Sequence, residues 1–425
     1  MVAAAVIFFV GALLMGFATN YAFVMFGRFV AGIGVGFALV IAPIYTVEVS
    51  PESSRGFLTS FPEVFINAGI LLGYVSNFAF SKLPTHLSWR FMLGIGAIPS
   101  VFLAISVLAM PESPRWLVMK GRLREARTVL KKTSESLEEA ESRLRGIKEA
   151  VGIPEHCNED IVQVPKHQKG DNVWKELFFS PTPSIKHIVL TGISIHFFQQ
   201  ASGIDSVVLY SPTIFERAGI KSDHDRLLAT VAMGCVKTIF ILVATFLLDR
   251  VGRTPLLLTS LGGMTLSLIF LSIGLTVINH SDGKVIWAVA LCITMVLAYV
   301  ALFSIGTGPI AWVYGSEVFP LRLRATGFSV AVAVNRVSSG VISMTFLSLE
   351  KAITIQGAFF LYAGIAGMAW VFFFTLMPET RGKTLEETEA LFGTFFKWRS
   401  TLRELKAKKN NNAQIQMATA DAVGS

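Results

Sequence analysis

The sequence contains little charge and very little cysteine. Only 16% of the 425 residues are charged, whereas 52% are hydrophobic and 34 are phenylalanine. This balance excludes an ordinary soluble domain and is typical of a polytopic membrane protein. The three cysteines, Cys157, Cys235 and Cys292, have neither disulfide nor zinc spacing. We therefore expect them to act as small apolar side chains, and we expect no metal site.

Acidic residues are also scarce: Asp and Glu number 29 against 37 Lys and Arg, which gives a net charge of +8. A basic chain can bind nucleic acid, but here the basic residues lie mainly between and after apolar segments. That placement follows the positive-inside rule of membrane proteins. The sequence therefore predicts a lipid bilayer, and no nucleic acid, as a partner.

Ten apolar segments are long enough to cross a bilayer. They lie at about 2–19, 22–46, 57–80, 90–110, 185–211, 227–248, 255–279, 285–311, 327–349 and 355–377. The pattern predicts an all-α polytopic membrane protein with about ten transmembrane helices. The polar stretch between the fourth and fifth segments contains two short amphipathic patterns, which indicate a linker rather than a catalytic domain.

Lysine and arginine fall on one side of the predicted spans. The linker, the loop with Arg250 and Arg253, and the tail are basic, whereas the opposite loops hold few basic residues, such as Lys82. The linker and the C-terminus are therefore predicted to be cytosolic. The predicted domains are an N-terminal half of four spans, the cytosolic linker, a C-terminal half of six spans and a cytosolic tail, at 1–110, 111–184, 185–377 and 378–425.

Two pairs of motifs show an internal repeat. Residues 48–55 and 317–324 share a Glu-Val-x-Pro run followed by arginine, and Pro-Glu-Ser at 111–113 reappears as Pro-Glu-Thr at 378–380 with nearly the same offset. Such repeats are common in secondary transporters. The second copy has six spans but the first has four. We therefore expect this chain to lack the first two helices of a twelve-helix architecture.

Polar residues lie in the middle of the apolar run from Ile195 to Tyr210. Gln199, Ser202 and Asp205 are spaced by three residues, which places them near one face of a helix. Polar groups at this depth usually face a bundle interior or an aqueous cavity. Such a row suits a ligand made mostly of hydroxyl groups, and the alternative is hydrogen bonding between packed spans.

Short motifs occur in a fixed order along nearly the whole chain. They are Gly27-Arg28, Pro43-Ile-Tyr45 with Glu48, Arg55-Gly56, PESPRW at 111–116, QQASG at 199–203, DRVGR at 249–253, GPIAW at 308–312, Glu317 with Arg324, and PETRGK at 378–383. The ordered set resembles the sugar porters of the major facilitator superfamily, and most of all the plant polyol and monosaccharide proton symporters. The resemblance implies a major facilitator fold.

The resemblance also implies transmembrane transport of polyols (sorbitol, mannitol, xylitol, inositol) and of monosaccharides. Transport would proceed by alternating access and proton symport, driven by the proton gradient, without another cofactor and without an enzymatic step. The expected membrane is the plasma membrane, with the vacuolar membrane as the alternative. An uncoupled facilitator and an inactive or regulatory truncated isoform stay open as functions. The sequence predicts no particular oligomeric state.

The resemblance, carried over by position, implies that Gln199 and Gln200 hydrogen-bond the substrate and that Trp312 packs against its carbon face. Amides match vicinal hydroxyls as donors and acceptors, and an indole offers an apolar surface with one hydrogen-bond donor. The other positions of the implied substrate site are Glu63, Asp205, Lys237, Asn335 and Arg336. Four of these are charged where the family has neutral groups.

An isolated charge inside a membrane span is costly, by at least about 2.5 kcal/mol. We therefore expect the four charges to pair, Asp205 with Lys237 and Glu63 with Arg336. Charged groups strengthen hydrogen bonds to hydroxyls and suit flexible open-chain polyols. The alternative is that Lys237 and Arg336 only extend toward the membrane surface or neutralise structural carboxylates.

Proton coupling requires a group whose protonation changes as the cavity changes side. The resemblance implies an aspartate on the family's first helix, paired with the arginine that corresponds to Arg28. Because the sequence is predicted to lack that helix, the carboxylates considered for coupling are Glu63 and Asp205, together with Arg28.

Carboxylates that end one span and arginines that open the next predict a cytosolic gate. The expected pairs are Glu48 with Arg55 and Glu317 with Arg324, while Asp249 and Arg253 join the second pair. These pairs would hold the cytosolic side closed in the outward-open state. The alternative is that the arginines only anchor the topology.

Overall fold

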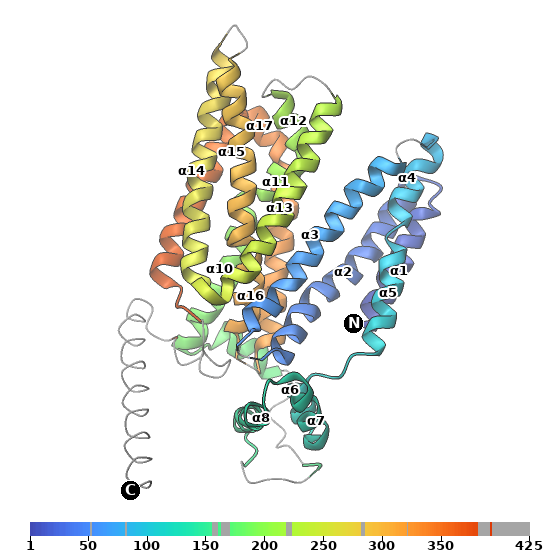
Figure 1. The fold of residues 1–425 in the computed structure, drawn as a ribbon, viewed down its shortest axis with the longest axis vertical. Helices are drawn as coiled ribbons and strands as arrows, with labels where there is room; N and C mark the ends of the chain where they lie inside the picture. The colour runs from blue at the N-terminus through green and yellow to red at the C-terminus, as the bar shows by residue number, and fades with distance from the viewer. Residues whose placement is uncertain are drawn as a thin grey trace.

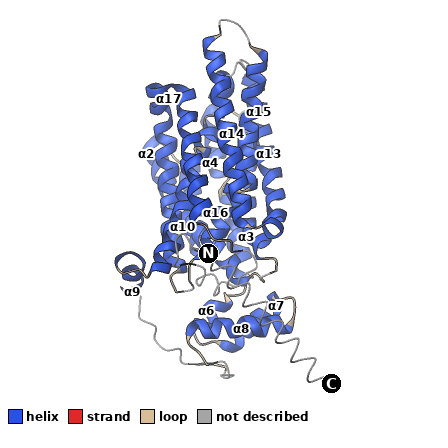
Figure 2. Ribbon diagram, turned by 90° about the vertical axis from the view of Figure 1, so that its left-hand side faces the viewer, coloured by secondary structure: helices blue, strands red, loops and turns tan. Residues whose placement is uncertain are grey.

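The computed structural model describes residues 1–380, apart from 52, 81–82, 155–159, 163–170, 218–222, 282–284 and 321, together with Phe392. Within these residues every regular element is a helix, which confirms the all-α prediction (Figure 2). Cys157, Lys82 and nearly all of the predicted tail lie outside the described residues.

The first four predicted spans form a group that we call the first bundle. Its helices are α1 (Val2–Gly16), α2 (Tyr21–Val49), α3 (Arg55–Phe80), α4 (Thr85–Gly94) and α5 (Ala97–Leu108). The side chain of Asn20 begins α2 by accepting a hydrogen bond from the backbone nitrogen of Phe23 at 2.8 Å, as expected of an N-cap residue. Helices α4 and α5 together make the fourth span.

The linker contains short amphipathic helices. They are α6 (Pro114–Met119), α7 (Leu123–Thr133), α8 (Leu137–Val151) and α9 (Asp171–Trp174), followed by the π-helical turn η1 (Lys175–Phe179). Leu117, Leu130 and Leu144 belong to a small apolar core that is formed by α6, α7 and α8. Helices α6–α8 lie beneath the long helices, at the end where the two bundles meet (Figure 1).

The remaining spans form the second bundle. Its helices are α10 (Pro183–Ala201), α11 (Ile204–Leu209), α12 (Ser211–Arg217), α13 (Asp223–Val251), α14 (Arg253–His280), α15 (Ile286–Ile305), α16 (Thr307–Val318) and α17 (Arg324–Leu376). Helix α17 covers two predicted spans, which meet at the non-helical residue Thr354. Each of the ten predicted segments is therefore helical, and seven helices of the described part are long and apolar enough to cross a membrane. The predicted domain boundaries stay predictions.

The two bundles contact each other through α2 and α3 on one side and α13, α16 and α17 on the other. Helices α3 and α13 lie together near the end that carries α6–α8 and diverge toward the opposite end (Figure 1). The contact is thus concentrated at the linker end of the molecule.

Two spans of the second bundle are interrupted inside the protein. Gly203 separates α10 from α11 with φ of +87°, and Gly306 separates α15 from α16. Backbone groups freed in this way need internal partners in a membrane. The Tyr299 hydroxyl donates to the carbonyl of Ser202 at 2.9 Å, and the Ser260 hydroxyl accepts from the nitrogen of Thr307 at 3.1 Å.

Replacing Gly203 by alanine is expected to destabilise the second bundle. The new Cβ would lie 2.6 Å from the Tyr362 ring and would hold an L-residue at positive φ, at a cost of about 2 kcal/mol. The measurement is the midpoint of thermal unfolding in detergent. Gly364→Ala is the matched control, because that Cβ meets no neighbour within 4 Å and alanine is the better helix former. Equal midpoints for the two variants would contradict the prediction.

Candidate functional site

The predicted amides come together at the break between α10 and α11. The Gln199 side-chain nitrogen donates to the carbonyls of Gly308 at 2.9 Å and Thr307 at 3.3 Å, at the start of α16. The Asn335 amide nitrogen, from α17, donates to the Gln199 side-chain oxygen at 2.7 Å. Three helices therefore share one buried amide network, and the Gln199 amide is held in a fixed orientation.

The charged part of the network continues along α17. Arg336 Nε donates to the Asn335 Oδ1 at 2.9 Å, and Ser339 donates to the Asp205 carboxylate. With the Gln200 amide nitrogen turned toward Asp205, this nitrogen lies 3.0 Å from the Asp205 carboxylate, and the Gln200 amide oxygen lies 3.0 Å from the Arg336 guanidinium. Gln200 thus bridges a carboxylate and a guanidinium that belong to the same bundle.

Trp312 lies on α16 beside this network. Its ring is edge-on to His196 at 5.3 Å between centroids, and the Arg336 guanidinium lies 5.9 Å from the ring centroid, within cation–π range. Trp312 is only 4% exposed in this conformation. His196 is a packed histidine: its ring packs against Trp312, and its backbone carbonyl accepts a hydrogen bond from the Asn335 amide at 3.0 Å.

Glu63 and Lys237 lie on facing helices of the two bundles. Glu63, on α3, is buried, and its carboxylate accepts a hydrogen bond from the Asn67 side chain at 3.1 Å. Lys237, on α13, lines a small cleft together with Asn67, Val208 and Met233. The cleft places a cation, an amide and apolar surface between α3, α11 and α13.

The four charges are arranged differently from the expected pairs. Among the described residues none of them has an opposite charge within 4.0 Å. Asp205 and Arg336 share Gln200 within the second bundle, whereas Glu63 and Lys237 lie on α3 and α13, which pack against each other from opposite bundles. Neither of the expected pairs, Asp205 with Lys237 and Glu63 with Arg336, forms an ion pair in the described part of the chain.

Arg28 stands apart from these residues. It is exposed on α2, and no hydrogen bond or ion pair joins it to the other candidates within the described part of the chain. Seven of the eight candidate substrate residues lie in the second bundle, around α10, α11, α16 and α17 or at the adjacent cleft. The eighth, Glu63, lies on α3 of the first bundle. The structure does not bring Arg28 to any of them.

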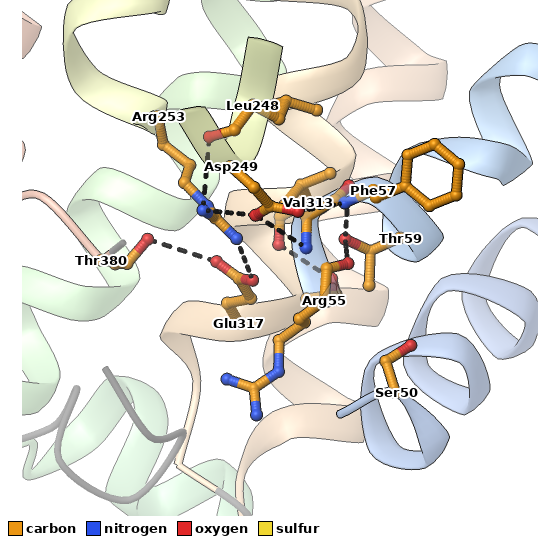
Figure 3. A network of polar contacts seen from close by, with 12 residues as sticks. Ser50, Arg55, Phe57, Thr59, Leu248, Asp249, Arg253, Val313, Glu317 and Thr380 are labelled. Atoms are coloured by element: carbon orange, nitrogen blue, oxygen red, sulfur yellow. Dashed lines mark hydrogen bonds and ion pairs between the residues drawn. The ribbon is translucent and has the colours of Figure 1, made fainter. Parts of the chain in front are cut away.

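The predicted gate residues meet where the two bundles touch. The Asp249 carboxylate, at the end of α13, accepts hydrogen bonds from the backbone nitrogens of Gly56 at 3.2 Å and Phe57 at 2.7 Å (Figure 3). These nitrogens belong to the first turn of α3, where backbone donors lack helical partners and negative charge is favoured. Asp249 thus caps a helix of the other bundle.

Arg253 joins the acidic residues of this cluster. Its guanidinium lies 3.1 Å from both Asp249 and Glu317, and the Arg253 and Glu317 side chains are each 4% exposed. Thr380 donates to the other oxygen of Glu317 at 3.2 Å (Figure 3). Arg55 lies beside the cluster at the N-terminus of α3. The prediction that Asp249 and Arg253 join Glu317 agrees with this geometry.

The Glu48 carboxylate also reaches across the interface. It lies 3.8 Å from the Arg324 guanidinium of α17, and it accepts a hydrogen bond from Ser113 at 2.5 Å. The expected pairs of Glu48 with Arg55 and of Glu317 with Arg324 stay predictions. The ion pair of Glu48 with Arg324 was not expected, and it joins the two bundles because α2 packs against α17.

Two contacts outside the predicted set follow the internal repeat. Ser113 binds Glu48 and Thr380 binds Glu317, so the residue after each Pro-Glu run holds the repeated glutamate of its own copy. The repeated motifs contain the signal for these two hydrogen bonds, but the order of the motifs along the sequence does not show which residues bind each other. Glu379 was also missed: its carboxylate accepts from the nitrogens of Arg253 and Thr254 at 3.0 and 2.8 Å and caps α14.

The fold defines a class of membrane transporter. The chain is similar to a solved structure described as the major facilitator superfamily proton:xylose symporter XylE bound to 6-bromo-6-deoxy-D-glucose, with a TM-score of 0.78, 27% identity, and coverage of 92% of this chain and 82% of that one. The inward open conformation of the xylose transporter XylE from E. coli matches with a TM-score of 0.63 at 26% identity and the same coverage. The major facilitator fold predicted from the sequence is confirmed.

The family follows from the sequence comparisons. A family profile described as "Sugar (and other) transporter" matches residues 1–392, so the chain belongs to this family of transporters, which are not enzymes. Polyol transporter 5 of Arabidopsis thaliana is 63% identical over 414 residues, covering 97% of this chain and 76% of that protein. Putative polyol transporter 1 of the same plant is 65% identical over 396 residues, covering 93% and 78%.

Removing Arg253 is expected to weaken the interface between the bundles strongly. Arg253→Met removes the guanidinium that lies 3.1 Å from both the buried Glu317 and Asp249, and breaking a buried ion pair in this way typically costs about 3–5 kcal/mol. The measurement is thermal unfolding in detergent. Arg122→Met is the control, because Arg122 and Glu125 form a pair that is about half exposed and such pairs contribute about 0.5 kcal/mol. The prediction fails if both variants unfold at the same temperature.

Proposed function

We propose that this chain carries polyols and monosaccharides across a membrane by proton symport. The observation that supports this most is the buried hydrogen-bonded pair of amides Gln199 and Asn335, with Gln200 bridging Asp205 and Arg336, beside the indole of Trp312. A polyol presents hydroxyl groups on a short carbon chain, and it needs both hydrogen-bonding amides and an apolar surface. The similarity to polyol transporters of Arabidopsis thaliana supports the same substrate class.

The position of the site suits alternating access. Gln199, Asn335 and Trp312 belong to the second bundle and Glu63 to the first, so a ligand between them contacts both bundles. In a transporter of this kind one bundle rocks against the other around a central site. The contacts of Asp249, Glu317 and Glu48 close the linker end, and the higher TM-score to the sugar-bound XylE than to its inward open form fits a molecule closed at that end.

The gate residues act by electrostatics in this proposal. Asp249, Arg253 and Glu317 form charge-assisted hydrogen bonds, and Glu48 with Arg324 adds a second contact between the bundles. The linker and the C-terminus face the cytosol, in line with their positive charge. Opening toward the cytosol then requires these contacts to break. The membrane we propose is the plasma membrane, and the driving force is the proton gradient.

The direct test is uptake of labelled sorbitol in transporter-deficient yeast that expresses the chain, with and without a protonophore. We expect uptake that the protonophore abolishes. Uptake that survives the protonophore would support an uncoupled facilitator instead. A correctly inserted protein without uptake of sorbitol, inositol or a monosaccharide would contradict the proposed function and favour a regulatory role.

Gln199→Leu is expected to raise the KM for sorbitol about tenfold, because one substrate hydrogen bond is lost and the Asn335 amide nitrogen loses one of its two acceptors. The assay is the concentration dependence of uptake, normalised to the amount of protein in the membrane. Thr345→Val is the control, since that exposed hydroxyl binds only carbonyls of its own helix. An unchanged KM in Gln199→Leu would remove this residue from the site.

A further inference from the structure

Glu63 of α3 and Lys237 of α13, which we call the charged couple, lie on helices of opposite bundles that pack against each other, without an ion pair within 4.0 Å. Glu63 is 6% exposed, and its hydrogen bond from Asn67 comes from the next turn of its own helix. Lys237 reaches the same region from α13 and lines the cleft that Asn67 also lines. Helices α3 and α13 pack together near the linker end and diverge away from it (Figure 1). The separation of these two groups therefore depends on how the bundles are placed.

The charged groups near Glu63 come from three other helices. They are Lys237 of α13, Arg336 of α17 and Asp205 of α11. Opposite charges attract far more strongly in a protein interior than in water. Of the two cations, only Lys237 lines the cleft that Asn67, the hydrogen-bond donor to Glu63, also lines.

Asp205 is in a different situation. Its carboxylate accepts from Ser339 and lies 3.0 Å from Gln200, which in turn lies 3.0 Å from Arg336. All of these groups belong to the second bundle, so a movement of that bundle as a unit leaves their distances unchanged. The charge on Asp205 is therefore stabilised equally in both orientations of the site, whereas that on Glu63 is not.

We propose that Glu63 is the proton-binding group of the symporter and that Lys237 is its counter-ion from the opposite bundle. This inference rests on the proposed function and specifies its coupling. A proton from the outer side neutralises the Glu63 carboxylate and removes its attraction to the Lys237 ammonium, so α3 and α13 are free to separate as the site turns to the cytosolic side. There the carboxylic acid releases its proton to the cytosol. The ionised carboxylate then attracts the Lys237 ammonium again, and the bundles return to their first arrangement.

The coupling follows from linkage. A group whose proton affinity differs between two conformations biases the equilibrium between them when it binds a proton. Here the nearby ammonium favours the ionised carboxylate, and its withdrawal favours the acid. Proton binding and the rocking of the bundles are reciprocal effects of one interaction.

The test measures protons transported per polyol. The purified chain is reconstituted into liposomes, and sorbitol flux and proton flux are recorded together with labelled sorbitol and a pH-sensitive dye. Glu63→Gln and Lys237→Met are both expected to reduce this ratio to near zero. Lys237→Arg, which keeps the positive charge, is expected to retain it. Asp205→Asn is the matched control: it disturbs the amide network and raises the KM for sorbitol, but it leaves the ratio at its original value.

The double variant Glu63→Lys with Lys237→Glu distinguishes the loss of one specific charge interaction from a general loss of function caused by substitution in a membrane span. It keeps one carboxylate and one ammonium facing each other, so proton-coupled flux is expected to return above that of either single variant. If Glu63→Gln keeps the original ratio, or if the double variant transports less than both single variants, the inference is overturned. Sorbitol flux without proton flux in the unmodified chain would instead overturn symport itself, so the two failures are distinguishable.

Discussion

The contact between a carboxylate and the first turn of a helix in the other bundle is the interaction on which the arrangement depends. Asp249 accepts from the nitrogens of Gly56 and Phe57, and Gly56 has no room for a side chain because a Cβ there would lie 2.2 Å from the carboxylate. Arg253 then holds Asp249 and Glu317 in place. A charge set against a helix terminus is strong when partly buried, yet it can be broken without unfolding either bundle.

The helices and the repeat could be predicted from the sequence, but the contacts between bundles could not. Apolar length identifies a span wherever it lies, and repeated Glu-Val-x-Pro motifs reveal duplication, because both are local signals. The partner of Glu48 depends on which part of α17 lies against α2. Proximity in the sequence suggested Arg55, but it did not indicate the contact with Arg324 that the packing of α2 against α17 produces. Contacts between bundles are set by a register that no local pattern encodes.

The contacts within the substrate site could also be predicted only in part from the sequence. The amides of Gln199 and Gln200 were predictable, because polar groups in a span must face other polar groups or a cavity. Their convergence with Asn335 required the break at Gly203 and the start of α16 after Gly306, which bring three helices together. For the charges, consecutive spans suggested Asp205 with Lys237, but Gln200 bridges Asp205 to Arg336, and Lys237 lies on α13, which packs against α3.

The hydrogen bonds of Ser113 to Glu48 and of Thr380 to Glu317 are one contact in two copies. In each copy, the segment that follows the last helix of a bundle folds back and binds the glutamate at the end of an earlier helix of that bundle. The start of the linker and the start of the tail therefore hold equivalent places in the two repeats, and each fastens the end of its own bundle.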